Sequence, residues 1–231
     1  MTLRYAVYFA PAESTALWQA ACQWLGRDPR TGRSLAQPEV DGWPAERISH
    51  LTAAPRMYGF HATLKAPFRL AEGRTIVQLA SALQQIALRL KAFIVPQLSV
   101  RVLDGFLALQ PGDDDARLNA VADACVVELE SFRRPPPAEE LAHRRGTRLS
   151  PRQDQLLLQF GYPYVLDQFR FHMTLTERLS DADARVLAPW LRDYFAAALS
   201  FPLRCEDLCL FVQDGPGEAF QLLQRFPLDI R

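Results

Sequence analysis

The sequence predicts an α+β fold of two pseudo-symmetric lobes, with mostly antiparallel sheets flanked by helices and an active-site groove between the lobes. One phrase occurs twice, as Phe-His-Ala-Thr-Leu at residues 60–64 and as Phe-His-Met-Thr-Leu at residues 171–175. Half of the four histidines lie in these two copies. A strand, a helix and a hairpin are expected in the same order in both halves. Together these observations predict an internal duplication and a mixed, largely antiparallel fold.

The first half, about residues 1–134, begins with an apolar run over 1–10 that predicts a strand. Ser14–Leu25 has the apolar spacing of a helix, and Gly26 is a suitable stop. The next segment, 27–57, is rich in Arg, Pro and Gly and has weak periodicity. We expect it to be an irregular functional loop whose arginines are candidates to reach a ligand.

The first copy of the phrase predicts a strand over about Tyr58–Phe68, and Thr75 begins the helix that follows. Asp104-Gly105, between two strand-like runs, is a strong hairpin signal. Asp113–Phe132 has the apolar stripe of another helix. The prolines at 135–137 end this helix and begin the connection between the halves, about residues 135–150.

The second half, about residues 151–231, carries the second copy on a predicted strand over about Phe169–Thr176. Before it, residues 138–160 look helical with an interruption over Gly146–Pro151, and after it Ser180 resembles a helix cap. Pro189 should kink or divide that later helix. Two strand-like runs, 201–211 and 219–226, close the sequence around a Gly-Pro turn.

Length and composition fit a single bilobal domain over residues 1–231, since 49% of the residues are hydrophobic and 23% are charged. The balance of 26 basic against 26 acidic residues argues against binding of a long nucleic acid. No run is long enough to span a membrane. The four cysteines form no C-x-x-C pair, and we expect reduced, buried thiols and a cytoplasmic protein.

The two phrases have the chemistry of a phosphate site. At positions i and i+2 of a strand, His61 and Thr63 project to one face, as do His172 and Thr174, while the apolar neighbours face a core. A histidine pair supplies one neutral base and one protonated acid near neutral pH. The threonine hydroxyls can donate to phosphate oxygens, so this chemistry requires no metal or other cofactor. Lys65 shares the predicted face and is a candidate for added positive charge.

These phrases resemble the two-histidine (2H) phosphoesterase superfamily, and Tyr-Gly-Phe-His-Ala-Thr-Leu-Lys-Ala-Pro-Phe at 58–68 resembles its branch labelled phosphonate-metabolism proteins. So does the Gly-Tyr-Pro-Tyr-Val run at 161–165 that precedes the second motif. The resemblance implies two lobes and action on cyclic phosphates or 2',5'-linked phosphodiesters. It also implies that His61 and His172 are the catalytic pair and that Thr63 and Thr174 bind phosphate.

Other residues have simpler interpretations. Tyr162 is a candidate for stacking on the substrate, although aromatic residues in such turns more often pack in a core. Arg4 and Tyr8 share one side of the first strand, and we favour an exposed arginine and a packed tyrosine over a role in the groove. The remaining histidines and a basic cluster are left outside the site; they are His50, His143, Arg133, Arg134, Arg144, Arg145 and Arg148.

The sequence therefore predicts a hydrolase of the 2H type, a cyclic phosphodiesterase that opens a small sugar or nucleotide phosphate, in phosphonate utilisation. Its expected partner is a small phosphorylated or cyclic-phosphate metabolite. Two alternatives stay open, a phosphate-metabolite binding protein of the same fold and an enzyme that processes RNA 2',3'-cyclic ends or joins 2',5' ends. P-loop, G-x-S-x-G, H-E-x-x-H and dinucleotide-binding signatures are absent from the sequence.

Overall fold

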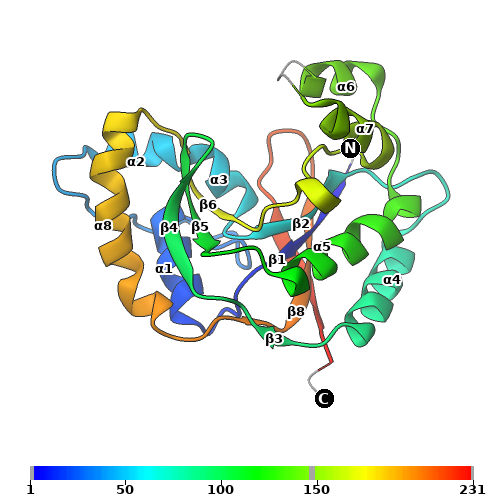
Figure 1. The fold of residues 1–231 in the computed structure, drawn as a ribbon, viewed down its shortest axis with the longest axis horizontal. Coiled ribbons are helices and arrows are strands. Elements are labelled where there is room, and N and C mark those ends of the chain that lie inside the picture. The colour runs from blue at the N-terminus through cyan, green and yellow to red at the C-terminus, as the bar shows by residue number, and fades with distance from the viewer. Residues whose placement is uncertain (1–2, 146–148, 230–231) are drawn as a thin grey trace.

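A computed structural model describes residues 3–145 and 149–229 and shows a seven-stranded sheet with the order β4-β5-β6-β2-β1-β8-β9 (Figure 1). Every neighbouring pair in this sheet is antiparallel. The two remaining strands, β3 and β7, pair with each other. The strand bounds are Arg4–Phe9 (β1), Ala62–Phe68 (β2), Phe93–Ile94 (β3), Leu98–Leu103 (β4), Phe106–Pro111 (β5), Met173–Arg178 (β6), Arg204–Cys205 (β7), Asp207–Gln213 (β8) and Gln221–Pro227 (β9).

The halves of the chain are interleaved in this sheet. The hairpin β4–β5 comes from the first half of the chain but pairs with β6, the strand of the second motif. The hairpin β8–β9 comes from the end of the chain but pairs with β1. The two groups of strands meet at β2 and β6, where Ala62 and Met173 form the paired position.

Helices cover the sheet. They are Ala16–Leu25 (α1), Ala45–Leu51 (α2), Ala53–Tyr58 (α3), Ile76–Arg89 (α4), Ala116–Glu128 (α5), Ala138–Arg145 (α6), Pro151–Phe160 (α7) and Asp181–Leu199 (α8), with short 3₁₀ turns at Glu130–Phe132 and Leu166–Gln168. One core cluster joins α1, α4, α5 and α8 to alternate residues of the central strands. The structure confirms the predicted α+β class with a large antiparallel sheet.

Several predicted boundaries are confirmed by their caps. Thr15 accepts a hydrogen bond from the Trp18 amide at the start of α1, and Gly26 ends α1 with a φ of 78°. Thr75 forms a capping box with Gln78 at the start of α4. The Asp104-Gly105 turn has positive φ at both residues, 47° and 88°, as a two-residue hairpin requires.

Two local predictions need correction. Residues 27–57 are not wholly irregular, because α2 and most of α3 lie within them. Pro189 does not divide α8, which continues through it as one helix of 19 residues. Pro189 lies on the exposed side of α8, while Leu187, Ala188 and Leu191 are buried and pack the helix against the core. The predicted interruption at Gly146–Pro151 lies in part outside the described residues, and the described part shows Ser150 capping α7.

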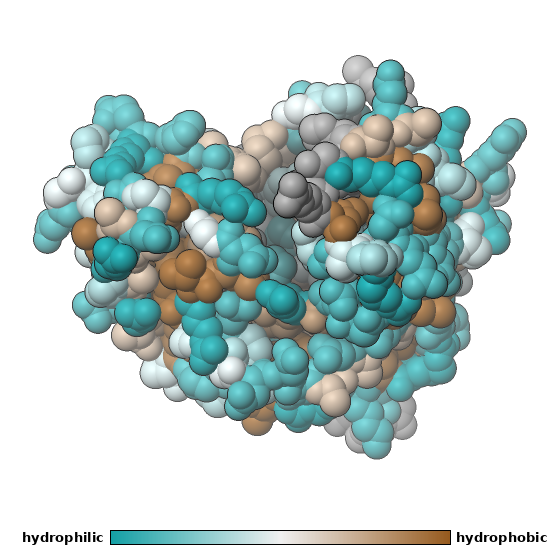
Figure 2. All heavy atoms as spheres, turned by 45° about the horizontal axis from the view of Figure 1, so that its top comes forward, coloured by the Kyte–Doolittle hydropathy of each residue, from teal (hydrophilic) through white to brown (hydrophobic). Residues whose placement is uncertain are grey.

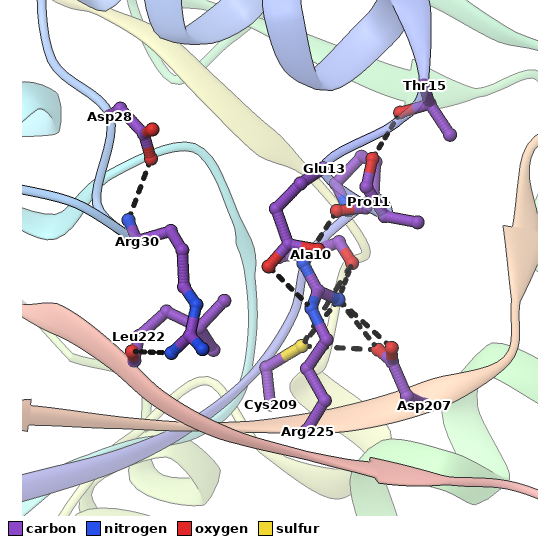
Figure 3. Close-up of polar contacts among 11 residues, drawn as sticks. Ala10, Pro11, Glu13, Thr15, Asp28, Arg30, Asp207, Cys209, Leu222 and Arg225 are labelled. Carbon is purple, nitrogen blue, oxygen red and sulfur yellow. Dashed lines mark hydrogen bonds and ion pairs between the residues drawn. The ribbon is translucent and has the colours of Figure 1, made fainter.

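A buried polar cluster joins β9 to the end of β1 (Figure 3). The Arg225 guanidinium donates to the Ala10 and Pro11 carbonyl oxygens and to both oxygens of Asp207, and it pairs with Glu13. Because Asp207 is only 8% exposed, its charge depends on this arginine. The cluster therefore fixes the chain where it leaves β1 and turns towards α1.

The four cysteines are free and buried, as expected. Burial raises the pKa of each thiol, so these side chains behave as small apolar core residues. Among the described residues, we find no helix with the length and apolar character needed to cross a bilayer.

Candidate active site

Each histidine lies one residue before a strand, which shortens both predicted motif strands at their start. The predicted alternation of faces is confirmed. Phe60, Ala62 and Leu64 belong to the main core cluster, and so do the equivalent apolar residues of the second copy. The histidines and threonines between them are only partly buried and face a cleft.

The register of β2 and β6 brings the two motifs together. Because Ala62 pairs with Met173 in an antiparallel arrangement, His61 lies opposite Thr174, and Thr63 lies opposite His172. All four side chains line one cleft of about 560 Å³, a size that suits a small ligand. The face shown in Figure 2 is hollowed between the side that carries α2 and α8 and the side that carries α6 and α7.

Both ring nitrogens of His61 are engaged. Nδ1 lies 2.8 Å from the Gly59 carbonyl oxygen, so Nδ1 carries the proton, and Nε2 accepts from the Thr63 hydroxyl at 3.1 Å. Tyr8 stacks on the imidazole with ring centroids 3.7 Å apart. Burial lowers the pKa of His61 to about 4, the Gly59 carbonyl opposes this shift, and His172 adds to it. His61 is therefore a neutral imidazole at pH 7.

His172 repeats only part of this arrangement. Its Nδ1 lies 2.7 Å from the Arg170 carbonyl oxygen, again two residues earlier, so the same tautomer is fixed. Its Nε2 has no hydrogen-bond partner among the described residues and is free for a ligand. Burial lowers the pKa of His172, the Arg170 carbonyl and Asp104 oppose the shift, and the Arg170 side chain adds to it. The Asp104 carboxylate thus favours the protonated form of His172, whereas no carboxylate among the described residues has this effect on His61.

The prediction that Lys65 adds positive charge to the site needs correction, because its side chain does not line the cleft. The pairing of β1 with β2 is irregular between Val7 and Tyr8, so the residues after Leu64 change faces. The Lys65 ammonium is buried and donates to the Val126 carbonyl at 2.9 Å and to Glu130 at 3.0 Å. Its charge is thus matched inside the protein and is not directed at a substrate.

The second motif strand shows the same irregularity. The pairing of β5 with β6 shifts between Phe106 and Ala108, and Thr176, the counterpart of Lys65, is 1% exposed. The Thr176 hydroxyl accepts a hydrogen bond from the Leu107 amide at 3.0 Å. We assumed a period of two along the whole of each motif strand. The bulge ends that period at Lys65, whereas Thr176 is almost fully buried but still contributes to the lining of the cleft.

Tyr162 lines the cleft, as its candidate role requires, and its ring makes an edge contact with Tyr164. Arg4 and Tyr8 also line the cleft. Tyr8 is packed as we expected, with 0% of the residue exposed, whereas Arg4 is only partly exposed, which corrects the prediction of an exposed arginine outside the groove. Sequence reasoning assigned no site role to several further residues that line the cleft. They include Tyr58, Phe106, Glu177 and Arg178.

The arginines of the first long loop serve the fold. Arg27 donates to the Phe220 carbonyl and Arg56 to the Leu25 carbonyl, so neither meets the expectation that loop arginines reach a ligand. In the basic cluster, Arg133 pairs with Glu130 and Arg145 with Asp154, while Arg148 lies outside the described residues. Within 3–145 and 149–229, no group of three or more His, Cys, Asp or Glu side chains is placed to hold a metal ion.

Comparison with known sequences gives a family and two relatives. Residues 63–221 match the family described as "Protein of unknown function (DUF1045)". A relative from Janthinobacterium sp. (strain Marseille), named Ribose 1,5-bisphosphate phosphokinase PhnN, is 40% identical over 228 residues, or 97% of this chain and 50% of the relative. One of the same name from Laribacter hongkongensis (strain HLHK9) is 38% identical over 223 residues, or 95% and 50%. The chain spans about half the length of these curated relatives.

Solved structures with a similar arrangement include a phosphoesterase, with a TM-score of 0.41, 13% identity and coverage of 97% of this chain and 98% of the other. Escherichia coli LigT complexed with 3'-AMP has a TM-score of 0.42 and 14% identity over 99% of each chain. LigT complexed with NADP+ has a TM-score of 0.39 and 12% identity over 98% of each.

Proposed function

The chain belongs to the DUF1045 family, and we propose that it is a phosphoesterase that hydrolyses a cyclic phosphodiester of a small sugar or nucleotide by two-histidine acid–base catalysis. One observation carries this proposal. Main-chain carbonyls fix the tautomer of His61 and His172, and both rings line the cleft that also holds Thr63 and Thr174. A phosphodiester bound there meets two proton carriers and two hydroxyl donors.

The reaction divides the proton transfers between the two rings. Nε2 of neutral His61 takes a proton from water, whose oxygen forms a bond to phosphorus. The bond from phosphorus to one sugar oxygen breaks, and protonated His172 gives its proton to that oxygen. The product is a phosphate monoester on the neighbouring sugar oxygen. On substrate binding, the Thr63 hydroxyl turns from His61 Nε2 to one non-bridging oxygen, which leaves Nε2 free for the water, and Thr174 donates to the other non-bridging oxygen.

The surroundings of the rings support this assignment of roles. A base must start without a proton, and the low pKa of His61 ensures this at neutral pH. An acid must start protonated; burial lowers the pKa of His172, and the Arg170 carbonyl and Asp104 oppose this shift. A bound phosphodiester anion would raise the pKa of both rings and so favour the protonated form that the acid needs. His61 is therefore proposed as the base and His172 as the acid.

The names of the relatives narrow the proposed substrate. A protein named ribose 1,5-bisphosphate phosphokinase acts on a ribose with two phosphates, and this chain corresponds to about half of such a protein but lacks a P-loop signature. Opening a 1,2-cyclic phosphate of ribose 5-phosphate at the bond to O2 leaves the phosphate on O1. The product would be ribose 1,5-bisphosphate, so we propose the cyclic ribose phosphate as the substrate, with a role in phosphonate utilisation.

A substrate panel tests the function. Ribose 5-phosphate 1,2-cyclic phosphate, 2',3'-cyclic nucleotides and RNA with 2',3'-cyclic ends are each assayed with a chelator present. We expect turnover of the small cyclic phosphates and a loss of about 10²- to 10⁴-fold in both His61→Ala and His172→Ala. His50→Ala is the matched control, because His50 is an exposed histidine of α2 that does not line the cleft.

Each contrary result has a defined meaning. Near wild-type turnover in both histidine variants would contradict the acid–base proposal. Loss of turnover with the chelator would contradict a metal-independent reaction. Saturable binding of cyclic phosphates with no product would favour the binding protein, and a preference for RNA ends would favour the end-processing enzyme.

A further inference from the structure

Three side chains with uncommitted polar groups lie beside the paired motifs, on the β1 side of His61. Arg4, Tyr8 and Tyr58 all line the cleft. They surround the buried ring of Phe220, which lies 5.5 Å from the Arg4 guanidinium carbon, 6.2 Å from the Tyr8 ring and 5.4 Å from the Tyr58 ring. The mechanism uses none of the three as an acid, a base or a phosphate donor.

The Tyr8 hydroxyl is buried and has no hydrogen-bond partner in the part of the chain that the structure describes. Its residue is 0% exposed, so the unsatisfied hydroxyl carries a free-energy cost that a ligand could remove. The ring itself is already packed, since it stacks on His61 and lies 4.9 Å from the ring of Phe211. The hydroxyl is thus the part of Tyr8 that remains for recognition.

Arg4 supplies the positive charge. Its Nε donates to Gln213 at 2.6 Å, which holds the side chain in place, and its terminal nitrogens have no partner among the described residues. Tyr5 pairs with Phe68, so Arg4 lies near the end of β2 that follows Thr63. His172 lies opposite Thr63, so Arg4 and the proposed acid lie towards the same end of the strands.

The electrostatic surroundings of Tyr8 connect these groups. Burial raises the pKa of Tyr8, Tyr58 and Tyr162 raise it further, and Arg4 lowers it. The Tyr8 hydroxyl therefore keeps its proton at neutral pH and lies within the influence of two more phenols and one guanidinium. Such a set of donors around one cation suits the oxygens of an anion.

We propose that Arg4, Tyr8 and Tyr58 form a second anion subsite, which binds a phosphate monoester on the same substrate whose cyclic phosphodiester lies between the histidines. This inference rests on the proposed function. It makes the preferred substrate a phosphorylated cyclic sugar phosphate, not a cyclic phosphate with a single phosphorus. A flat base is a poorer occupant, because Tyr8 offers its hydroxyl edge and Phe220 covers one face of Tyr58.

Arg178 is the rival for the second phosphate. It lines the same cleft from β6 and also has no ion-pair partner among the described residues. It pairs with Phe106, on the opposite side of the motifs from β1. If Arg4 binds the second phosphate, Arg4→Gln should lose recognition of that phosphate. If Arg178 binds it, the loss should occur in Arg178→Gln instead.

The test compares two substrates that differ by one phosphate, ribose 5-phosphate 1,2-cyclic phosphate and ribose 1,2-cyclic phosphate. The readout is the ratio of their kcat/KM values. We expect the wild type to prefer the phosphorylated substrate, and Arg4→Gln to reduce this preference by about 10- to 100-fold, the effect of losing a charge-assisted hydrogen bond. Arg185→Gln, an exposed arginine of α8, is the matched control and should keep the preference. An unchanged ratio in Arg4→Gln, or a loss confined to Arg178→Gln, would overturn the proposal.

Tyr8→Phe tests the hydroxyl alone. The variant keeps the ring on His61 and removes a hydroxyl with no partner, so its melting temperature should equal or exceed that of the wild type. Its preference for the phosphorylated substrate should fall severalfold. A lower melting temperature with an unchanged preference would show a purely structural role for this hydroxyl.

Failure of the subsite and failure of the proposed function give different results. If the wild type opens no cyclic phosphate, the proposed function fails, and the subsite is judged by calorimetric titration with ribose 5-phosphate. Its affinity should then weaken at least about tenfold in Arg4→Gln and stay unchanged in Arg185→Gln. Equal affinities in all three proteins would contradict the subsite.

Discussion

The two copies of the motif share a sequence but not an environment. His61 has both ring nitrogens engaged and a tyrosine stacked on its face, and its pKa is lowered to about 4. In His172, Nε2 has no hydrogen-bond partner among the described residues. Its ring centroid lies 5.8 Å from that of Phe106 in a tilted contact, and the charge of Asp104 favours its protonated form. We propose that the neighbours of each strand, not the motif itself, make one imidazole the better base and the other the better acid.

The strongest test of this difference exchanges the leaving group. On a sugar phosphodiester, His61→Ala and His172→Ala should each lose about 10²- to 10⁴-fold in kcat. On an aryl phosphodiester such as a nitrophenyl ester, the departing oxygen needs no proton, so His172→Ala should recover most of its loss. His61→Ala should not recover. Steady-state rates on both substrates measure this recovery. If His61→Ala recovered instead, His61 would be the acid and His172 the base.

The threonines should differ in a subtler way. Thr63→Val and Thr174→Val each remove one donor to the phosphate and should lower kcat by about 10²-fold. The Thr63 hydroxyl also stabilises neutral His61, so its loss should move the acidic limb of the pH–rate profile to higher pH. Thr174 has no such contact among the described residues. Equal acidic limbs of the kcat/KM profile in both variants would mean that the Thr63 contact does not affect the pKa of His61 in the free enzyme.

The pH dependence of kcat/KM follows from the two pKa values. The base works above the pKa of His61, about 4, and the acid works below that of His172, which is lowered from 6.5. We therefore expect a bell-shaped profile with its maximum on the acid side of pH 6.5. Above the second pKa the rate should fall about tenfold per pH unit. A plateau that continues to pH 8 would contradict this assignment.

Lys65 should have the smallest effect on turnover. Lys65→Met keeps the length of the side chain but removes the donor to Val126 and Glu130, and Glu130 keeps its pair with Arg133. We expect a loss of about 1–3 kcal/mol in the free energy of unfolding. Urea denaturation measures this loss, and kcat/KM on the cyclic substrate should change little. A large fall in kcat/KM with unchanged stability would indicate that Lys65 acts on the substrate.

The sequence was most informative where local rules decide the structure. The doubled motif predicted four cleft residues because their alternation is set by strand geometry, and the caps at Thr75 and Ser180 were visible in the residue types. It was least informative where distant segments meet. Nothing near Tyr8 in the chain shows that His61 will stack on it, and nothing near Lys65 predicts the bulge that removes it from the cleft.

Arg4 illustrates the same limit. Its place beside the cleft depends on Gln213 and Phe220, which lie on and next to the last hairpin. Residue type alone favours solvent for an arginine near a strand end, and that preference is correct for most surface arginines. The exception arises only from strand order, which the repeated phrase did not specify.

That strand order also affects how the protein is made. β1 pairs on one side with β8, so the wall that carries Tyr8 stays incomplete until the ribosome has produced the segment that holds Phe211 and Phe220. Contacts so distant along the chain form slowly, because a long loop must close first. A nascent chain that already contains both histidines would therefore still lack a finished cleft wall until Phe211 and Phe220 have also been synthesised.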